Sequence, residues 1–233
     1  MGFEALVRWN HPVDGLVAPD NFIGLAEECG VIVAIGDWVI FEACREAVGW
    51  PVPYRISVNV SPVQFKQGNL VLSVTNALKQ SGLDPKRLEV EITEGVLIDD
   101  RERALDQLQR LKALGVRVAM DDFGTGYSSM SYLRTFPFDQ IKLDRSFITG
   151  LSTNREARAI VRATTSLARD LDMGVVAEGV EFEDDLDFLR NEQRIDIQGY
   201  LLSRPLSRGQ ISEFLGNVPD LRKSAAVRTG TDG

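Results

Sequence analysis

Histidine and cysteine are nearly absent from this chain of 233 residues, which contains one histidine, His11, and two cysteines, Cys29 and Cys44. Two cysteines are too few for a disulfide framework or a zinc ribbon. A single histidine excludes histidine-rich metal sites, and it excludes Ser-His-Asp catalysis and histidine acid–base chemistry unless His11 itself takes part. What remains abundant is carboxylate, because the chain has 34 aspartate and glutamate residues.

Long hydrophobic runs and an excess of basic charge are also missing. No run approaches the roughly 18 apolar residues that a membrane helix needs, and no signal peptide opens the sequence. Acidic residues outnumber the 26 lysines and arginines, so the formal net charge is −8. This balance argues against general nucleic-acid binding through phosphate contacts. We therefore expect no membrane segment in this chain and no general affinity for nucleic acid.

Short apolar runs rich in β-branched residues alternate with helical patterns over most of the chain. Strands of a parallel sheet have this composition because both of their faces are covered. In a chain of this length the alternation predicts one α/β domain folded as a (β/α)8 barrel. Seven strands are predicted, at Phe3–Trp9, Arg55–Val60, Leu88–Ile92, Val116–Met120, Gln140–Leu143, Gly174–Ala177 and Ile195–Gln198.

The count of seven strands is one short of a closed barrel. Because the chain begins almost directly inside a strand, we expect that the first barrel strand is absent from it, which would expose a sheet edge. The small, polar tail at 218–233 is expected to be disordered at its end. Between the strands, helical patterns begin at Pro19, Asp37 and Asp99 and cover Ser152–Leu171, Glu183–Arg190 and Ser207–Leu215.

Polar side chains stand at the end of nearly every predicted strand. A barrel of this kind keeps its chemistry at the carboxyl ends of its strands. Several carboxylates converging there would repel one another unless cations neutralised them. The residues at these ends are Asn59, Glu91, Glu94, Asp121, Asp122, Lys142, Asp144, Glu178, Glu181 and Gln198.

Oxygen ligands without histidine or cysteine favour hard divalent ions such as Mg²⁺ or Mn²⁺. The adjacent Asp121 and Asp122 suit two metals, and two ions about 3.5–4 Å apart form the usual clamp for in-line attack on a phosphodiester. Lys142 would add a positive charge beside the attacking water. Glu4 lies near the start of its predicted strand, so we expect that strand to run antiparallel to its neighbours if Glu4 belongs to the same site.

Several of these residues also have a structural interpretation. Asp121 and Asp122 could form a turn, and Asn59 could cap the next helix. Lys142 could form a salt bridge with Asp144. A helix dipole would equally explain the first-turn acids Glu94 and Glu181.

Seven short motifs occur in a fixed order: Glu4-Ala5-Leu6, Asn59-Val60-Ser61, Glu91-Ile92-Thr93-Glu94, Asp121-Asp122-Phe123-Gly124-Thr125-Gly126, Lys142-Leu143-Asp144, Glu178-Gly179-Val180-Glu181 and Gln198-Gly199-Tyr200. One Glu-Ala-Leu tripeptide would carry no weight, but seven ordered motifs are specific. Together they resemble the EAL-domain phosphodiesterases, which hydrolyse the bacterial second messenger cyclic di-GMP to linear pGpG. The resemblance implies an EAL domain over 1–217, folded as a modified TIM (β/α)8 barrel with one antiparallel strand and lacking its first strand here.

The resemblance implies two metal ions, Mg²⁺ or Mn²⁺, in each site. The residues similar to the ligands of the first metal are Glu4, Asn59, Glu91 and Asp121. Those similar to the ligands of the second are Asp121, Asp122 and Glu178. Ca²⁺ is expected to inhibit, because it is larger and tolerates irregular coordination.

The other matched residues are similar to residues that act on water, substrate or a loop. Glu178 resembles a general base acting through water, and Lys142 the residue that positions or polarises that water. Glu94 resembles the glutamate that braces the loop from Asp122 to Ser129, through which the family couples its site to dimerisation. Arg8, Gln198 and Glu181 resemble residues of the substrate-binding shell.

The resemblance therefore implies a metal-dependent cyclic di-GMP phosphodiesterase, a homodimer formed through the loop after Asp122, and a cytoplasmic location, although the parent protein could be tethered to a membrane. A catalytically inactive receptor for cyclic di-GMP is the alternative, favoured by the missing strand and disfavoured by the complete set of ligands. A carboxylate-metal barrel acting on another substrate, such as an enolase-type lyase, is a third candidate.

Overall fold

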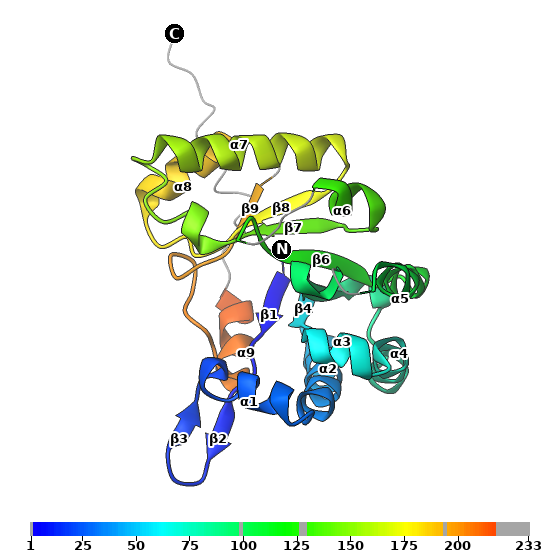
Figure 1. Cartoon of the computed structure of the whole chain (residues 1–233). Helices are drawn as coiled ribbons and strands as arrows, with labels where there is room; N and C mark the ends of the chain where they lie inside the picture. Colours follow the sequence, from blue (N-terminus) through cyan, green and yellow to red (C-terminus); the bar gives the residue numbers. More distant parts are fainter. Residues whose placement is uncertain (1, 98–99, 126–129, 193–194, 218–233) are drawn as a thin grey trace.

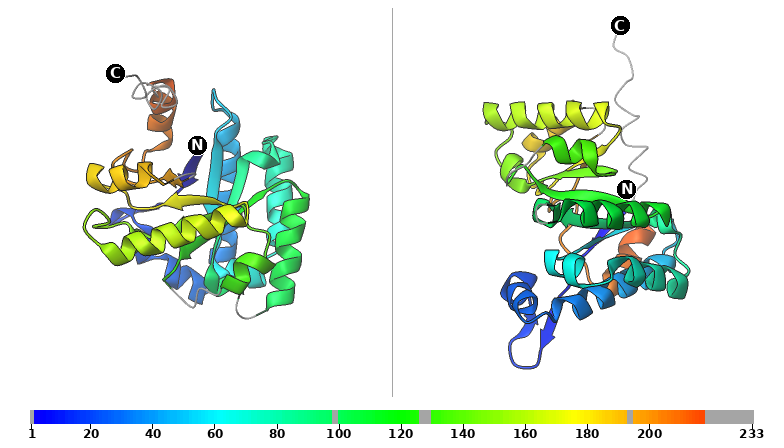
Figure 2. Two further views of the ribbon diagram at one scale, coloured as in Figure 1. Left: turned by 90° about the horizontal axis from the view of Figure 1, so that it is seen from above. Right: turned by 45° about the vertical axis from the view of Figure 1, so that its right-hand side comes forward.

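The computed structural model describes residues 2–97, 100–125, 130–192 and 195–217. Its centre is one parallel sheet that curls into an incomplete barrel, with helices along its outer side (Figures 1 and 2). The strand order is β1-β4-β5-β6-β7-β8-β9, so each neighbour along the sheet is also the next of these strands along the chain. The bounds are β1 Gly2–Ala5, β4 Arg55–Asn59, β5 Leu88–Thr93, β6 Arg117–Phe123, β7 Gln140–Leu143, β8 Gly174–Ala177 and β9 Ile195–Ile197.

All seven strands predicted from the sequence are present in this sheet, which confirms an α/β barrel-type fold. The central strands are covered on both faces, as their near-continuous apolar runs require. Leu88, Val90 and Ile92 of β5 are buried on one face of the strand, and Glu89 and Glu91 are buried on the other. The second face therefore brings charged groups into the interior.

The helices follow the strands and carry ordinary end signals. Asn69 accepts a hydrogen bond from Leu72 N at the start of α4, and Gly82 ends that helix with a φ of 74°. Asp100 and Asn154 cap α5 and α7 in the same way as Asn69. The bounds are α1 Ile23–Glu28, α2 Ile32–Val48, α3 Pro62–Gln67, α4 Leu70–Ser81, α5 Arg101–Ala113, α6 Met130–Thr135, α7 Arg155–Asp170, α8 Glu183–Arg190 and α9 Arg208–Asn217.

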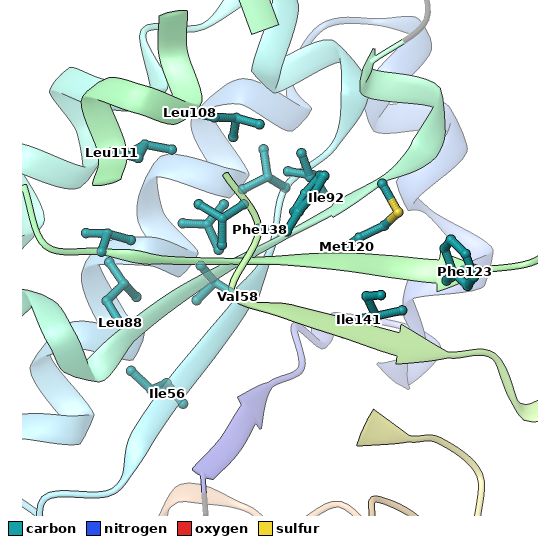
Figure 3. Packing of buried hydrophobic residues seen from close by; sticks show 14 of the residues in the cluster. Ile56, Val58, Leu88, Ile92, Leu108, Leu111, Met120, Phe123, Phe138 and Ile141 are labelled. Atoms are coloured by element: carbon teal, nitrogen blue, oxygen red, sulfur yellow. The ribbon is translucent and has the colours of Figure 1, made fainter. Parts of the chain in front are cut away.

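The largest part of the core lies between the outer face of the sheet and these helices. Leu108 and Leu111 of α5 are fully buried and face the strands, where Ile92 and Ile141 are buried too (Figure 3). The leucine stripe of α5 is thus core packing, as its spacing predicts. Within the described ranges, no helix is both long and apolar enough to cross a membrane.

The expectation that the strand containing Glu4 runs antiparallel to its neighbours is wrong. β1 pairs with β4 in parallel, with Glu4 opposite Ser57, and the other described pairings of this sheet are parallel as well. The error came from the predicted length of the strand. β1 ends at Ala5, so Glu4 lies at its carboxyl end and reaches the same edge of the sheet as the other candidate residues without a change of direction.

The remaining part of the predicted first strand belongs to a separate hairpin. Strands β2 (Trp9–His11) and β3 (Gly15–Val17) pair antiparallel and project from the sheet beside α1 (Figure 1). His11 lies in β2, and its Nδ1 is 2.8 Å from Asp14 Oδ2. The predicted tail at 218–233 lies outside the described residues.

Gly199 allows the end of β9 to approach the segment after β8. A Cβ built on Gly199 would lie 2.2 Å from Val180 O and 2.4 Å from Val180 N, and its φ is +157°. These contacts are with backbone, which cannot move aside as a flexible side chain can.

Gly199→Ala should therefore lower the free energy of unfolding by at least about 3 kcal/mol, measured by urea denaturation. Gly82→Ala is the matched control. Its φ is +74° with nothing within 4 Å of the added Cβ, and about 1–2 kcal/mol is expected. Equal losses in the two variants would contradict the argument from close approach.

Candidate metal and phosphodiester site

Side-chain alternation places the candidate residues on one face of the curled sheet. Residues two apart along a strand share a face. Ser57 and Asn59 on β4 and Glu89 and Glu91 on β5 are such pairs, and Asn59 is paired in register with Glu91. The second member of each pair is nearer the carboxyl end of its strand. The carboxyl ends of the parallel strands thus bring one polar residue each to the same layer of the barrel interior.

Lys142 on β7 is the centre of this layer, and 2% of its surface is exposed. Its Nζ donates to Glu91 Oε2 at 2.6 Å and lies 2.7 Å from Glu178 Oε1. Asp121 Oδ1 is 3.1 Å away and Glu4 Oε2 is 3.9 Å away. These contacts replace the predicted alternative of a salt bridge between Lys142 and Asp144. They join strands β1, β5, β6 and β7 and the segment that follows β8.

A bulge in β6 places two adjacent aspartates beside this lysine. Met120 pairs with Ile141 and Phe123 pairs with Leu143, so Asp121 and Asp122 together face the single residue Lys142. Asp122 has a φ of 52°, a left-handed conformation that aspartate tolerates better than most residues. The bulge breaks the normal alternation of side chains. Carboxylate oxygens of Asp121, Asp122 and Glu178 consequently lie within 4.8 Å of one another. Asp121 and Asp122 therefore belong to a strand, not to a simple turn.

Glu4 is held by two amides from different strands. Asn59 Nδ2 donates to Glu4 Oε1 at 2.6 Å, and Gln198 Nε2 donates to Glu4 Oε2 at 2.6 Å. The cap of α3 is Ser61, whose hydroxyl accepts a hydrogen bond from Val63 N, so Asn59 is not the helix cap. Because its nitrogen faces Glu4, the amide oxygen of Asn59 is the atom left for another ligand.

Burial and mutual repulsion shift the pKa values in the cluster. Burial raises the pKa of Glu178 to about 7, against the opposing effect of Lys142. Burial also raises the pKa of Glu91 and of Asp122, and the charge of Asp121 adds to both shifts. Burial alone would lower the pKa of Lys142, but the surrounding carboxylates raise it well above its ordinary value. The lysine is therefore charged, and the carboxylates around it are in excess.

The donor set fits divalent cations. Asp121 Oδ1 is buried and accepts no hydrogen bond of good geometry, despite its 3.1 Å approach to Lys142. When all are ionised, the five carboxylates around one ammonium group leave an excess of four negative charges, which two divalent ions would neutralise. Oxygen-only ligands are those that Mg²⁺ and Mn²⁺ take. The described residues best able to hold such ions are Glu4, Asn59, Glu91, Asp121, Asp122 and Glu178.

Three predicted site residues do not contact the lysine cluster in the described part of the chain. Arg8 donates to Val7 O at 2.7 Å and lines a mainly apolar groove of about 410 Å³ with residues of α1 and α2. Glu181 is exposed between β8 and α8. Glu94 opens the 3-10 turn Glu94–Leu97 directly after β5. Part of the loop that it is expected to brace, 126–129, lies outside the described residues.

One residue beside the site has no signal in the amino-acid sequence. Glu27 of α1 accepts a hydrogen bond from Ser61 Oγ at 2.6 Å, two residues after Asn59. It ties α1 to the end of β4. A glutamate in an amphipathic helix has no pattern that names a partner 34 positions away, so this contact could not be found from one sequence.

The geometry defines a class of protein, an incomplete parallel α/β barrel with a cation site at the carboxyl edge of its sheet. The family model for the EAL domain matches residues 1–205, and the chain belongs to this family.

Relatives agree with this membership. A signaling protein of Caulobacter vibrioides is 54% identical over 204 residues, which are 88% of this chain and 25% of that protein. The bifunctional diguanylate cyclase/cyclic di-GMP phosphodiesterase MucR of Pseudomonas aeruginosa is 44% identical over 215 residues, 91% of this chain and 31% of MucR. The chain thus spans about a quarter to a third of the length of the curated relatives it matches.

Solved structures show the same architecture. The phosphodiesterase MucR of P. aeruginosa in complex with c-di-GMP superposes with a TM-score of 0.84 at 44% identity, covering 89% of this chain and 86% of that one. The EAL enzyme Bd1971, with cAMP and cyclic di-GMP bound, gives a TM-score of 0.86 at 30% identity, covering 91% of this chain and 59% of that one. These EAL-family structures thus have the same fold as this chain.

Lys142→Met should destabilise the protein, because it leaves the carboxylates around Lys142 buried without a counter-charge. We expect a loss of about 3–5 kcal/mol in the free energy of unfolding, measured by urea denaturation in EDTA. Lys112→Met is the control. Lys112 Nζ makes one ion pair of 2.6 Å, with Asp139 Oδ1, at the part-exposed opposite edge of the sheet, and a loss near 1 kcal/mol is expected. A Lys142→Met protein as stable as the wild type would show that the ammonium does not hold the cluster together.

Metal affinity should depend on pH in a defined direction. A carboxylate must lose its proton to bind a metal ion. Because the pKa of Glu178 is raised to about 7, the proton competes with the metal at this carboxylate below pH 7 and not above it. The affinity for Mn²⁺, measured by calorimetry, should rise from pH 5.5 to beyond pH 8, because the pKa of Glu91, another proposed ligand, is raised to about 8. In Glu178→Gln the rise should be smaller, and an unchanged pH profile would argue against Glu178 as a ligand.

Proposed function

We propose that this chain is a metal-dependent phosphodiesterase that hydrolyses cyclic di-GMP to linear pGpG. The observation that carries the proposal is the convergence of Asp121, Asp122 and Glu178, three carboxylates within 4.8 Å, beside the buried ammonium of Lys142. Family membership supports the choice of substrate, because the relatives MucR and NbdA are both named as cyclic di-GMP phosphodiesterases.

Two divalent ions, when bound, would polarise the phosphate and lower the pKa of the attacking water. Glu4, Asn59, Glu91 and Asp121 are the proposed ligands of one ion, and Asp121, Asp122 and Glu178 those of the other. Mg²⁺ or Mn²⁺ is the proposed cofactor. The amide oxygen of Asn59, which faces away from Glu4, supports this assignment. So does Asp121 Oδ1, which is buried without a hydrogen-bond donor among the described residues.

Glu178 is proposed to accept the proton of the attacking water. A general base must lie near the proton that it accepts, and the Glu178 carboxylate lies within 4.8 Å of those of Asp121 and Asp122, where the water would be bound. The water oxygen forms a new bond to phosphorus while the bond to one ribose 3′-oxygen breaks. That oxygen leaves as a hydroxyl after taking up a proton. One phosphate stays on its 5′-carbon, which gives the linear product.

Lys142 is proposed to hold the reacting groups in place by its charge. Its Nζ lies 2.7 Å from Glu178 and 3.1 Å from Asp121, so the same ammonium orients the base and a proposed bridging ligand. A fixed positive charge here also stabilises the negative charge that builds up on the phosphate oxygens.

Arg8 and Glu181 remain proposed contacts of the substrate, and Glu94 the proposed brace of the loop after Asp122. A homodimer formed through that loop and a cytoplasmic location, where the substrate is found, complete the proposal. The apolar groove beside Arg8 supports a role in binding, because an arginine next to an apolar surface suits a ligand with phosphate and base groups.

Product analysis by chromatography tests this function. The purified chain is incubated with cyclic di-GMP and Mn²⁺, with EDTA in a parallel sample and Ca²⁺ added to a third. We expect linear pGpG with Mn²⁺ alone, none with EDTA, and less when Ca²⁺ competes, since its irregular coordination aligns the oxygens poorly.

Single substitutions test which residues the reaction requires. Asp121→Asn and Glu178→Gln should each lower kcat by roughly 10²- to 10⁴-fold, whereas Glu192→Gln should leave it unchanged, because Glu192 pairs with Arg162. Near-wild-type rates in both site variants would show that the site is wrongly assigned. Tight binding of cyclic di-GMP by the wild type, without product in Mg²⁺ or in Mn²⁺, would identify a receptor instead.

A further inference from the structure

The two ends of the curled sheet meet at Glu4. β1 has β4 as its partner on one side, and β9 has β8. Contacts of several kinds cross the opening between them. Gln198 Nε2 donates to Glu4 Oε2 at 2.6 Å, Arg55 Nη2 lies 4.0 Å from Asp196 Oδ2, and the rings of Phe3 and Phe214 are 6.2 Å apart. Of these contacts, the one made by Gln198 reaches a residue of the proposed metal site.

The backbone of Gln198 is fixed on both sides of its side chain. Its N–H donates to Ala177 O at 2.8 Å, and its carbonyl accepts from Val180 N at 3.0 Å. Gly199, next in the chain, packs directly against the backbone of Val180. The side chain of Gln198 therefore starts from a rigid position, which is needed if it is to orient another group.

The chemistry of the contact fixes which end of the amide faces Glu4. An ionised carboxylate only accepts hydrogen bonds, so the amide nitrogen must point toward it and the amide oxygen away. Asn59 does the same to the other oxygen of Glu4, also at 2.6 Å. With one amide on each oxygen, the carboxylate cannot rotate freely, although 13% of the Glu4 side chain is exposed.

We propose that Gln198 is a positioning residue, which orients the carboxylate of Glu4 for metal binding across the opening between β9 and β1. This inference rests on the proposed function and adds to it a role that differs from direct contact with the substrate. Groups that orient a metal ligand typically contribute 10- to 100-fold to metal affinity.

The test is the affinity for Mn²⁺ without substrate, measured by calorimetry on Gln198→Leu, which keeps the size of the side chain and removes its donor. We expect an affinity roughly 10- to 100-fold weaker than that of the wild type. Asp196→Asn is the matched control, because it removes the ion pair between β9 and Arg55 of β4 without touching Glu4. Its affinity for Mn²⁺ should equal that of the wild type. An equal loss in both variants would mean that Gln198 only closes the sheet, and would overturn the proposal.

A double-mutant cycle with Glu4→Gln shows whether Gln198 acts through Glu4. In the Glu4→Gln background, Gln198→Leu should cause no further loss of Mn²⁺ affinity. A full additional loss would overturn the proposal. Unchanged Mn²⁺ affinity in Gln198→Leu with a raised KM for cyclic di-GMP would also overturn it, and would return Gln198 to the substrate shell. A wild-type chain that binds no Mn²⁺ would contradict the proposed function itself, so the two failures are distinguishable.

Discussion

The buried ammonium of Lys142 is the interaction on which the rest of this structure depends. A charged group with 2% of its surface exposed is costly unless carboxylates surround it, and four of them do so, at 2.6–3.9 Å. Those carboxylates would in turn repel one another without the lysine. Each comes from a different strand or strand end, so the ion cluster forms only if the strands are parallel and their carboxyl ends lie at one edge. The ion cluster therefore depends on the parallel topology of the sheet, and the strand ends carry buried charges that need the cluster.

The bulge in β6 places two adjacent carboxylates on one face of the sheet, which a regular strand cannot do. In an unbroken strand, Asp121 and Asp122 would point to opposite faces, and one would enter the apolar layer beneath the helices. The left-handed Asp122, with a φ of 52°, allows both to face Lys142. The left-handed conformation of Asp122 costs free energy, and it occurs where two adjacent carboxylates are needed. Backbone strain at functional sites is typically placed in this way. Charge and backbone conformation therefore both select aspartate at this position.

Most of the sheet could be predicted from the sequence, because a buried parallel strand leaves a visible run of β-branched residues. All seven strands were found in this way, and the strand-end acids pointed to the correct edge. The direction of β1 was missed, since the apolar run from Phe3 to Trp9 hides a strand end at Ala5 and a new strand at Trp9. Periodicity measures which face a residue occupies, but it does not mark where the chain leaves the sheet.

Contacts within the site were harder to predict than its members. The sequence and the family resemblance both selected Lys142, but the sequence alone offered Asp144 as its partner, whereas Glu91 and Glu178 are the groups in contact. Similarly, Gln198 was assigned to the substrate by resemblance, and only coordinates could show that its amide lies on Glu4. Residue type and order specify which groups reach the edge. Distances between groups on distant segments depend on the curvature of the sheet, which no local pattern encodes.

The hydrogen bond between Glu4 and Gln198 joins residues 194 positions apart. Loops of that length close late, because the entropy of bringing distant segments together must be lost before the contact stabilises anything. During synthesis, the strands from β1 to β8 leave the ribosome before Gln198 does, so a growing chain carries its carboxylates without this last support. Maturation of the site is consequently coupled to completion of the sheet, and a chain that stops short of β9 would lack the contact that holds Glu4 from that side.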